Sequence, residues 1–284
     1  MNSYQRAKLA ENTLTILDYG AYVNAKGEVI DLSEEIKEAV NNTKLYSPEE
    51  LKNIDEKVNN VLNNSPKKET EIRVTNETTL NAAKRLKQAE NYKKVACLNF
   101  ASAKNPGGGF LNGSSAQEES LARSSALYPC IKQKNKMYEK NKKYDSALYL
   151  DYMIYSPQVP VFREDSGSLL DNPYQVSMIT APAVNAGVVR SRECKENEEK
   201  IEEKMKYRIE KILSIALINK NKALVLGAFG CGVFRNNPAE VANYFRKFIK
   251  EDERFNSYFE KIVFAVLDRS RKKETYNIFK REIM

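Results

Sequence analysis

Residues 95–119 read V-A-C-L-N-F-A-S-A-K-N-P-G-G-G-F-L-N-G-S-S-A-Q-E-E, and this stretch decides the fold. Its apolar start predicts a buried strand. Glycines at 107–109 and 113 follow in the first glycine loop, residues 107–114, where bare backbone N–H groups can approach a phosphorylated ligand closely. The adjacent carboxylates Glu118 and Glu119 come next, at the expected start of a helix. The stretch therefore predicts a strand, a ligand-binding loop and a helix in direct succession.

A second glycine loop, residues 227–234, follows another apolar stretch at 223–226. The chain holds only 11 glycines, and seven of them lie in these two loops, which ordinary turn usage does not explain. Spaced glycines allow successive N–H groups to form a concave anion site. Phe234 ends the loop, where an aromatic ring suits stacking on a sugar or base, with plain core packing as its alternative role.

The rest of the chain indicates an α/β layered fold. From about residue 70, strands and helices alternate, which predicts a ligand at the carboxyl ends of the strands. The first part is mainly helical, so we expect a helical N-terminal extension (1–68) packed on a core (69–284), as one structural unit. Strands are expected at 71–74, 95–100, 147–155, 175–180, 223–226 and 262–266, a short hairpin at 21–23 and 28–30, and helices at 3–17, 33–40, 47–62, 78–89, 116–127 and 196–218, with another capped by 237–240.

Composition narrows the function classes. The net charge is +8, but the basic residues are spread along the whole chain, so we expect no nucleic-acid partner. No apolar run is long enough to span a bilayer, and the N-terminus lacks the apolar segment of a secretory signal. The four cysteines have no metal-like spacing and are expected to be reduced thiols. We therefore expect a cytoplasmic protein without a membrane partner.

The chain contains no histidine. This excludes Ser-His-Asp and Cys-His catalysis and gives no indication of a zinc site. Acid–base chemistry near neutral pH must then fall mainly on carboxylates, which draws attention to Glu118 and Glu119. Residues 115–118 also read as a capping box, in which Glu118 would only satisfy the N–H of Ser115. Glu119 has no such structural duty.

Together these residues resemble the bacterial-type poly(ADP-ribose) glycohydrolases, a branch of the macrodomain superfamily. That family is marked by a triple glycine followed six to eight residues later by Gln-Glu-Glu, and here seven residues separate the two. The second glycine loop resembles the family's diphosphate loop, and residues 180–185 are also similar. The resemblance covers nearly the whole chain and implies a macrodomain-like mixed sheet flanked by helices.

The resemblance also implies roles for single residues. Glu119 would be the catalytic acid/base and Glu118 would orient ribose hydroxyls, without a metal or cofactor. The two loops would hold a diphosphate between them, and Phe234 would pack on the terminal ribose. Ser102 stands where relatives often have asparagine, so no role is carried over to it. The implied substrate-binding residues are Gly107, Gly108, Gly109, Gln117, Gly230, Cys231, Gly232, Val233 and Phe234.

The activity implied by the resemblance is cleavage of the terminal ribose–ribose O-glycosidic bond of poly(ADP-ribose), through an oxocarbenium-like transition state. The substrate would be poly(ADP-ribose) or an ADP-ribosylated protein, and ADP-ribose would be the product. Two alternatives stay open: a hydrolase of another ADP-ribose derivative, and a module that binds ADP-ribose without cleaving it. The intact Gln-Glu-Glu favours an enzyme, because a binding module has no need of Glu119.

Overall fold

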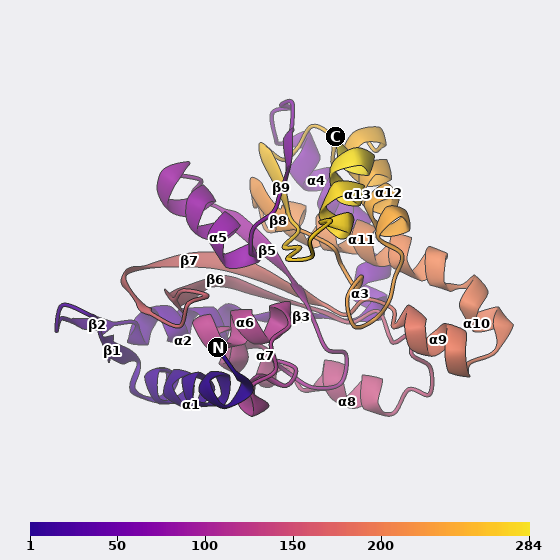
Figure 1. Ribbon diagram of the computed structural model, residues 1–284. Coiled ribbons are helices and arrows are strands. Elements are labelled where there is room, and N and C mark those ends of the chain that lie inside the picture. The colour runs from indigo at the N-terminus through magenta and orange to yellow at the C-terminus, as the bar shows by residue number, and fades with distance from the viewer.

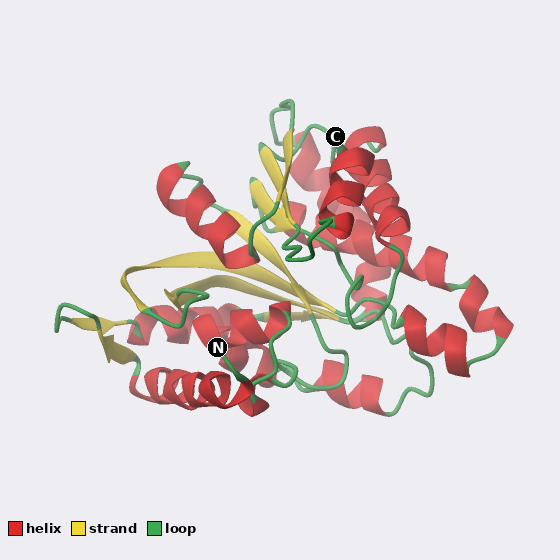
Figure 2. Cartoon of the chain, in the orientation of Figure 1, coloured by secondary structure: helices red, strands yellow, loops and turns green.

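A seven-stranded mixed sheet runs through the molecule, with helices on both faces (Figure 2). The computed structural model describes residues 1–284. The strand order is β3-β6-β7-β5-β8-β9-β4, in which β7, β5, β8, β9 and β4 are parallel and β6 is antiparallel to both of its neighbours. A separate hairpin pairs β1 with β2. The strands are β1 (Ala21–Val23), β2 (Val29–Asp31), β3 (Lys44–Tyr46), β4 (Glu71–Thr75), β5 (Val95–Phe100), β6 (Met153–Arg163), β7 (Leu169–Ala181), β8 (Ala223–Leu226) and β9 (Lys261–Ala265).

Two helical layers cover the sheet (Figure 1). One face packs against α3, α4, α9, α11, α12 and α13, and the other against α1, α2 and α5–α8. No helix combines the length and the apolar character needed to cross a membrane. The helices are α1 (Ser3–Tyr19), α2 (Ser33–Asn42), α3 (Pro48–Lys52), α4 (Asp55–Asn63), α5 (Thr79–Lys84), η1 (Arg85–Ala89), η2 (Phe110–Asn112), α6 (Gln117–Ser124), α7 (Leu127–Lys132), α8 (Lys136–Lys142), α9 (Ala186–Arg192), α10 (Lys195–Glu199), α11 (Ile201–Ile218), α12 (Pro238–Arg246), η3 (Lys247–Glu251) and α13 (Glu274–Ile283).

Strand β8 and most of β5 are apolar because both of their faces are covered. In β5, Val95 and Cys97 point into one hydrophobic core, whereas Ala96 and Leu98 point into the other. Side chains alternate between the faces of a strand, so a strand buried on both sides needs an unbroken apolar run. The expected α/β fold, a mixed sheet flanked by helices with a helical N-terminus, is thus confirmed.

Several element boundaries predicted from the sequence are wrong. The strand expected at 147–155 is β6, which starts only at Met153, because the preceding residues form a turn with Tyr149 in the left-handed region at φ 56°. The helix expected at 47–62 is broken into α3 and α4 near Asn53, and the one expected at 116–127 ends at Ser124. The sequence reasoning also missed β3.

The N-terminal residues are built into the core. Strand β3 forms an edge of the main sheet. The division into an N-terminal extension (1–68) and a core (69–284) stays a prediction. Helix α1 packs on η2 and α6. Arg6 on α1 donates from Nε to the carbonyl of Gly113, at 2.6 Å. Gly113 has a φ of 75°, and a Cβ atom there would collide with the backbone of Ser3.

This close approach gives a testable stability difference. Gly27 has a φ of 82° but open space around it, so Gly27→Ala should cost only backbone strain, about 1 kcal/mol. Gly113→Ala adds the collision with α1, and we expect it to cost at least about 2 kcal/mol more. Urea denaturation of both variants and the parent measures this. Equal costs for the two variants would show that α1 does not pack tightly on the first glycine loop.

Candidate active site

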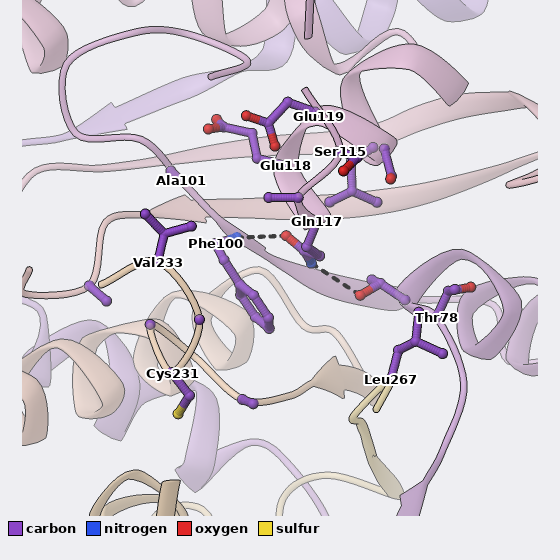
Figure 3. Close-up of a pocket in the computed structure, with 18 of the residues that line it drawn as sticks. Thr78, Phe100, Ala101, Ser115, Gln117, Glu118, Glu119, Cys231, Val233 and Leu267 are labelled. Atoms are coloured by element: carbon purple, nitrogen blue, oxygen red, sulfur yellow. Dashed lines mark hydrogen bonds between the residues drawn. The ribbon is translucent and has the colours of Figure 1, made fainter. Parts of the chain in front are cut away.

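A cavity of about 690 Å³ opens at the carboxyl ends of the parallel strands (Figure 3). Because these strands are parallel, the segments that follow them meet at one edge of the sheet. Both expected loops contribute to this edge, although Gly107, Gly108 and Gly109 themselves lie outside the cavity lining. The lining includes Glu77 to Leu80 after β4, Phe100 to Ser102, Lys104 and Asn105 at the end of β5 and after it, Ala183 after β7, Ala228 and Gly230 to Phe234 after β8, and Val266 to Arg269 after β9.

Glu118 is fixed by the end of β5. Its Oε2 accepts a hydrogen bond from the backbone N–H of Ser102 at 2.7 Å, and its Oε1 accepts one from the side-chain amide of Asn99 at 3.3 Å. The residue is only 3% exposed. Burial raises the pKa of Glu118 to about 8, and the neighbouring charge of Glu119 adds to this, while the two hydrogen bonds oppose it. Near neutral pH, Glu118 therefore holds a proton.

Glu119 is anchored at one oxygen only. Its Oε1 accepts a hydrogen bond from the N–H of Gly109 at 3.0 Å. Its Oε2 is buried and has no hydrogen-bond partner. The residue lines the cavity, and Figure 3 shows its carboxylate beside that of Glu118. A buried oxygen without a partner is costly, so this oxygen is free for a bound ligand.

Gln117 ties the start of α6 to the sheet. Its side-chain oxygen accepts from Phe100 N at 2.9 Å, and its amide nitrogen donates to Leu98 O at 2.7 Å and to Thr79 Oγ1 at 3.1 Å. The residue lines the cavity, but its polar atoms are already engaged with the protein, so it holds the carboxylates in place. The expected capping box is wrong, because the N-cap of α6 is Ala116 and Glu118 turns toward β5 instead.

The first glycine loop supports the carboxylates. A Cβ atom at Gly108, which has a φ of 57°, would collide with the Glu119 carboxylate and would lie 3.2 Å from Glu118 Oε2. Gly109 donates its N–H to Glu119, and Gly108 donates its own to Asn105 O. These glycines therefore allow the backbone to close behind the acid pair. The expected contact of the first glycine loop with a diphosphate stays a prediction.

The second glycine loop keeps its amides free. Asn236 closes it and ties it to the segment after β7, because its amide nitrogen donates to Gly230 O at 3.0 Å and to Val184 O at 2.8 Å. Gly230 has a φ of 73°, and a Cβ atom there would lie 2.5 Å from the Cβ of Ala183. Consecutive amides that face a cavity form a site for an anion. Five cavity-lining residues of this loop have N–H groups without an acceptor in the protein: Ala228, Gly230, Gly232, Val233 and Phe234.

An aromatic pair forms the wall beside this loop. The ring of Phe234 lies 5.9 Å from that of Tyr149, and both residues line the cavity. Arg208, fully buried, donates to the backbone oxygen of Tyr149 at 2.9 Å and so holds that turn. Burial raises the pKa of the Cys231 thiol to about 12. Cys231 therefore stays a neutral thiol and gives the loop no nucleophile.

Several residues of this site were missed or set aside by the sequence reasoning. Ser102 received no role, yet its N–H holds Glu118. Asn99, a polar residue inside an apolar strand, was a usable signal, since a buried amide needs partners. Tyr149 and Asn236 act through backbone conformation and loop closure, which residue type alone does not reveal.

The geometry agrees with comparisons to known proteins. A family model described as Microbial-type PARG, catalytic domain, matches residues 10–164, and no match is found among curated proteins. The poly(ADP-ribose) glycohydrolase of Thermomonospora curvata, solved with the inhibitor ADP-HPD bound, is 40% identical, with a TM-score of 0.89 over 98% of this chain and 99% of that one. The poly(ADP-ribose) glycohydrolase of Deinococcus radiodurans, solved with ADP-ribose, is 42% identical, with a TM-score of 0.78 over 87% of this chain and 96% of that one.

The buried proton of Glu118 makes stability depend on pH. In the unfolded chain this carboxyl ionises near 4.5, whereas in the folded protein it keeps its proton to about 8. The unfolded state therefore binds fewer protons in this window, and the free energy of unfolding falls as pH rises from about 4.5 to about 8. The contribution is fully present below the lower value.

Glu118→Gln cannot ionise and should lack this pH-dependent component. We expect the stability of the variant relative to the parent to improve by a few kcal/mol between about pH 5 and about pH 8. Urea denaturation of both proteins across this range measures the difference. If the two proteins show the same pH dependence, Glu118 is not protonated in the folded state.

Proposed function

The chain belongs to the microbial-type poly(ADP-ribose) glycohydrolase family, and we propose that it releases ADP-ribose by cleaving the terminal ribose–ribose O-glycosidic bond of poly(ADP-ribose). It is a glycohydrolase. The observation that carries this proposal is the free Oε2 of Glu119, buried in the cavity wall beside the buried carboxyl of Glu118. One oxygen is fixed by Gly109 while the other is left for substrate.

The reaction follows from that geometry. In the reacting complex Glu119 carries a proton on Oε2 and gives it to the departing 2′-oxygen while the bond from that oxygen to C1″ of the terminal ribose breaks. Positive charge then develops on the ribose, as in other glycoside hydrolyses. A water molecule adds to C1″ and returns one proton to Glu119, so the cycle consumes one water. Glu118, fixed and uncharged, is placed to bind the ribose hydroxyls around the bond.

The second glycine loop fits the diphosphate of the substrate. Its five free N–H groups belong to residues that line the same cavity as the two glutamates. Backbone donors held in a fixed loop bind phosphate without the entropy cost of ordering side chains. A diphosphate held there also stabilises positive charge on the adjacent ribose. Phe234 and Tyr149 offer flat faces to the sugar beside it.

Burial of the acid pair favours an enzyme over a module that only binds ADP-ribose. Moving a carboxyl out of water costs free energy, and here two neighbouring carboxyls are 3% and 9% exposed. A binding module would gain nothing from that cost. Hydrolysis of another ADP-ribose derivative stays the alternative activity, because the same carboxyls would serve it.

Three further assignments complete the proposal. We infer a reaction without a bound metal, because both oxygens of Glu118 and one of Glu119 already accept hydrogen bonds from the protein. The four cysteines are free thiols, which supports a cytoplasmic location. The order of parallel strands with the ligand cavity at their carboxyl ends supports a relation to the macrodomain proteins.

The activity and the acid are tested together. The parent, incubated with poly(ADP-ribose) in EDTA, should release ADP-ribose that chromatography detects. Glu119→Gln keeps the size of the side chain but cannot cycle a proton, so turnover should fall by about 10²- to 10⁴-fold. ADP-ribose affinity, measured by calorimetry, should barely change, since the loss lies in the transition state. A Glu119→Gln protein with near-parental turnover would falsify the assignment of the acid.

A methyl group at Gly108 should disturb the acid pair. Gly108→Ala pushes Cβ into the Glu119 carboxylate, so turnover should drop at least about tenfold. Gly27→Ala is the matched control, because Gly27 also has a positive φ, has no atom within 4 Å of its Cβ position and does not line the cavity. We expect less than a threefold change in turnover for this control. Steady-state kinetics on poly(ADP-ribose) compares them, and a Gly108→Ala enzyme as active as the control would contradict the described packing.

A further inference from the structure

The peptide that holds Glu119 is itself held by the first glycine loop. Gly109 donates its N–H to Glu119 Oε1 at 3.0 Å. The carbonyl of the same residue accepts hydrogen bonds from Asn112 N at 3.0 Å and Ser114 N at 3.2 Å. The orientation of the Gly109 amide, and with it the position of Glu119, therefore depends on where residues 112–114 lie.

Two guanidinium groups fix that end of the loop. Arg123, one helical turn after Glu119 on α6, donates from Nη1 to Ser114 O at 2.5 Å. Arg6, on α1, donates from Nε to Gly113 O at 2.6 Å. Two consecutive carbonyls are thus held from two different helices. Charged donors of this kind make stronger hydrogen bonds than neutral ones.

We propose that Arg123 is a positioning residue for Glu119, acting through the first glycine loop, and that Arg6 supports the same loop from α1. The link runs from Arg123 to the Ser114 carbonyl, from the Ser114 N–H to the Gly109 carbonyl, and from the Gly109 N–H to Glu119. This assigns the N-terminal helix a role in catalysis although α1 does not line the cavity. The assignment rests on the function proposed above.

The burial of Arg123 supports a functional role for its charge. The residue is 5% exposed, and burial lowers the pKa of its guanidinium, while the nearby charge of Glu119 opposes that change. A buried cation is costly unless it is well paired. Its backbone carbonyl also accepts from Thr13 Oγ1 at 2.6 Å and from Arg163 Nε at 3.2 Å, so the segment that carries it is locked in place.

The test separates turnover from binding. In Arg123→Gln, the loop loses its donor, and we expect kcat on poly(ADP-ribose) to fall about 10- to 100-fold with KM within about threefold of the parent. ADP-ribose affinity by calorimetry should also stay within about threefold, because the second glycine loop is untouched. Arg123→Lys keeps a charged donor and should recover at least about a third of the parental kcat. Arg6→Gln should give a smaller fall in kcat of the same type.

A matched control distinguishes positioning from stability. Arg254 is also a partly buried guanidinium, donating to Glu210 Oε1 at 2.8 Å and to Asp252 Oδ2 at 2.6 Å, but it bonds neither to the first glycine loop nor to Arg123 and does not line the cavity. Arg254→Gln should lower the thermal midpoint about as much as Arg123→Gln while kcat changes less than threefold. Should Arg123→Gln fail to fold, Arg6→Gln and Arg123→Lys carry the comparison.

A double variant gives the decisive result. If Arg123 acts only through Glu119, then adding Arg123→Gln to Glu119→Gln should change the residual turnover less than about twofold. A full further loss in that background would overturn the proposal, as would an Arg123→Gln enzyme whose kcat equals that of the Arg254→Gln control. A parent without any activity on poly(ADP-ribose) would instead refute the proposed function, so the two failures are distinguishable.

Discussion

The structure depends on one costly constraint, the burial of two adjacent carboxyl groups at the start of a helix. Neither can be left without partners away from water. Backbone N–H groups provide these partners: Ser102 N–H donates to Glu118, and Gly109 N–H donates to Glu119. Both donors come from the segment between β5 and α6. The packing of this segment between the sheet and α1 therefore positions the hydrogen-bond donors of both carboxyl groups.

The two glycine-rich loops meet this constraint and the needs of the ligand by different means. In the first glycine loop, backbone N–H groups bond to the acid pair and to carbonyls of the loop itself. Its glycines are needed because a side chain at Gly108 would occupy the space of the two carboxyl groups. The second glycine loop is closed by Asn236 and leaves the N–H groups of five cavity-lining residues without a partner in the protein. Similar composition thus serves two purposes, and only the hydrogen-bond partners tell them apart.

The sequence predicted the features that are local in the chain. Hydrophobic periodicity located β5, β8 and β9, and residue spacing located the acid pair. The sequence did not predict the features that depend on tertiary contacts. Strand β3 is only three residues long and is stabilised by its pairing with β6. Ser102 holds Glu118 through its backbone N–H, so its residue type gives no indication of this role. The roles of Gly108 and Arg123 are also visible only once the loop is folded onto α6.

The strand order has a consequence for synthesis of the protein. Strand β4, near the beginning of the core, pairs only with β9, whose residues 261–265 lie about 190 positions later. Contacts of such high sequence separation form slowly. During translation, β4 must therefore stay beside an unfinished sheet until residues 261–265 have left the ribosome and can pair with it. A nascent chain thus holds both glutamates long before it has a complete pocket, since the cavity edge after β9 is added about 150 residues later than the acid pair.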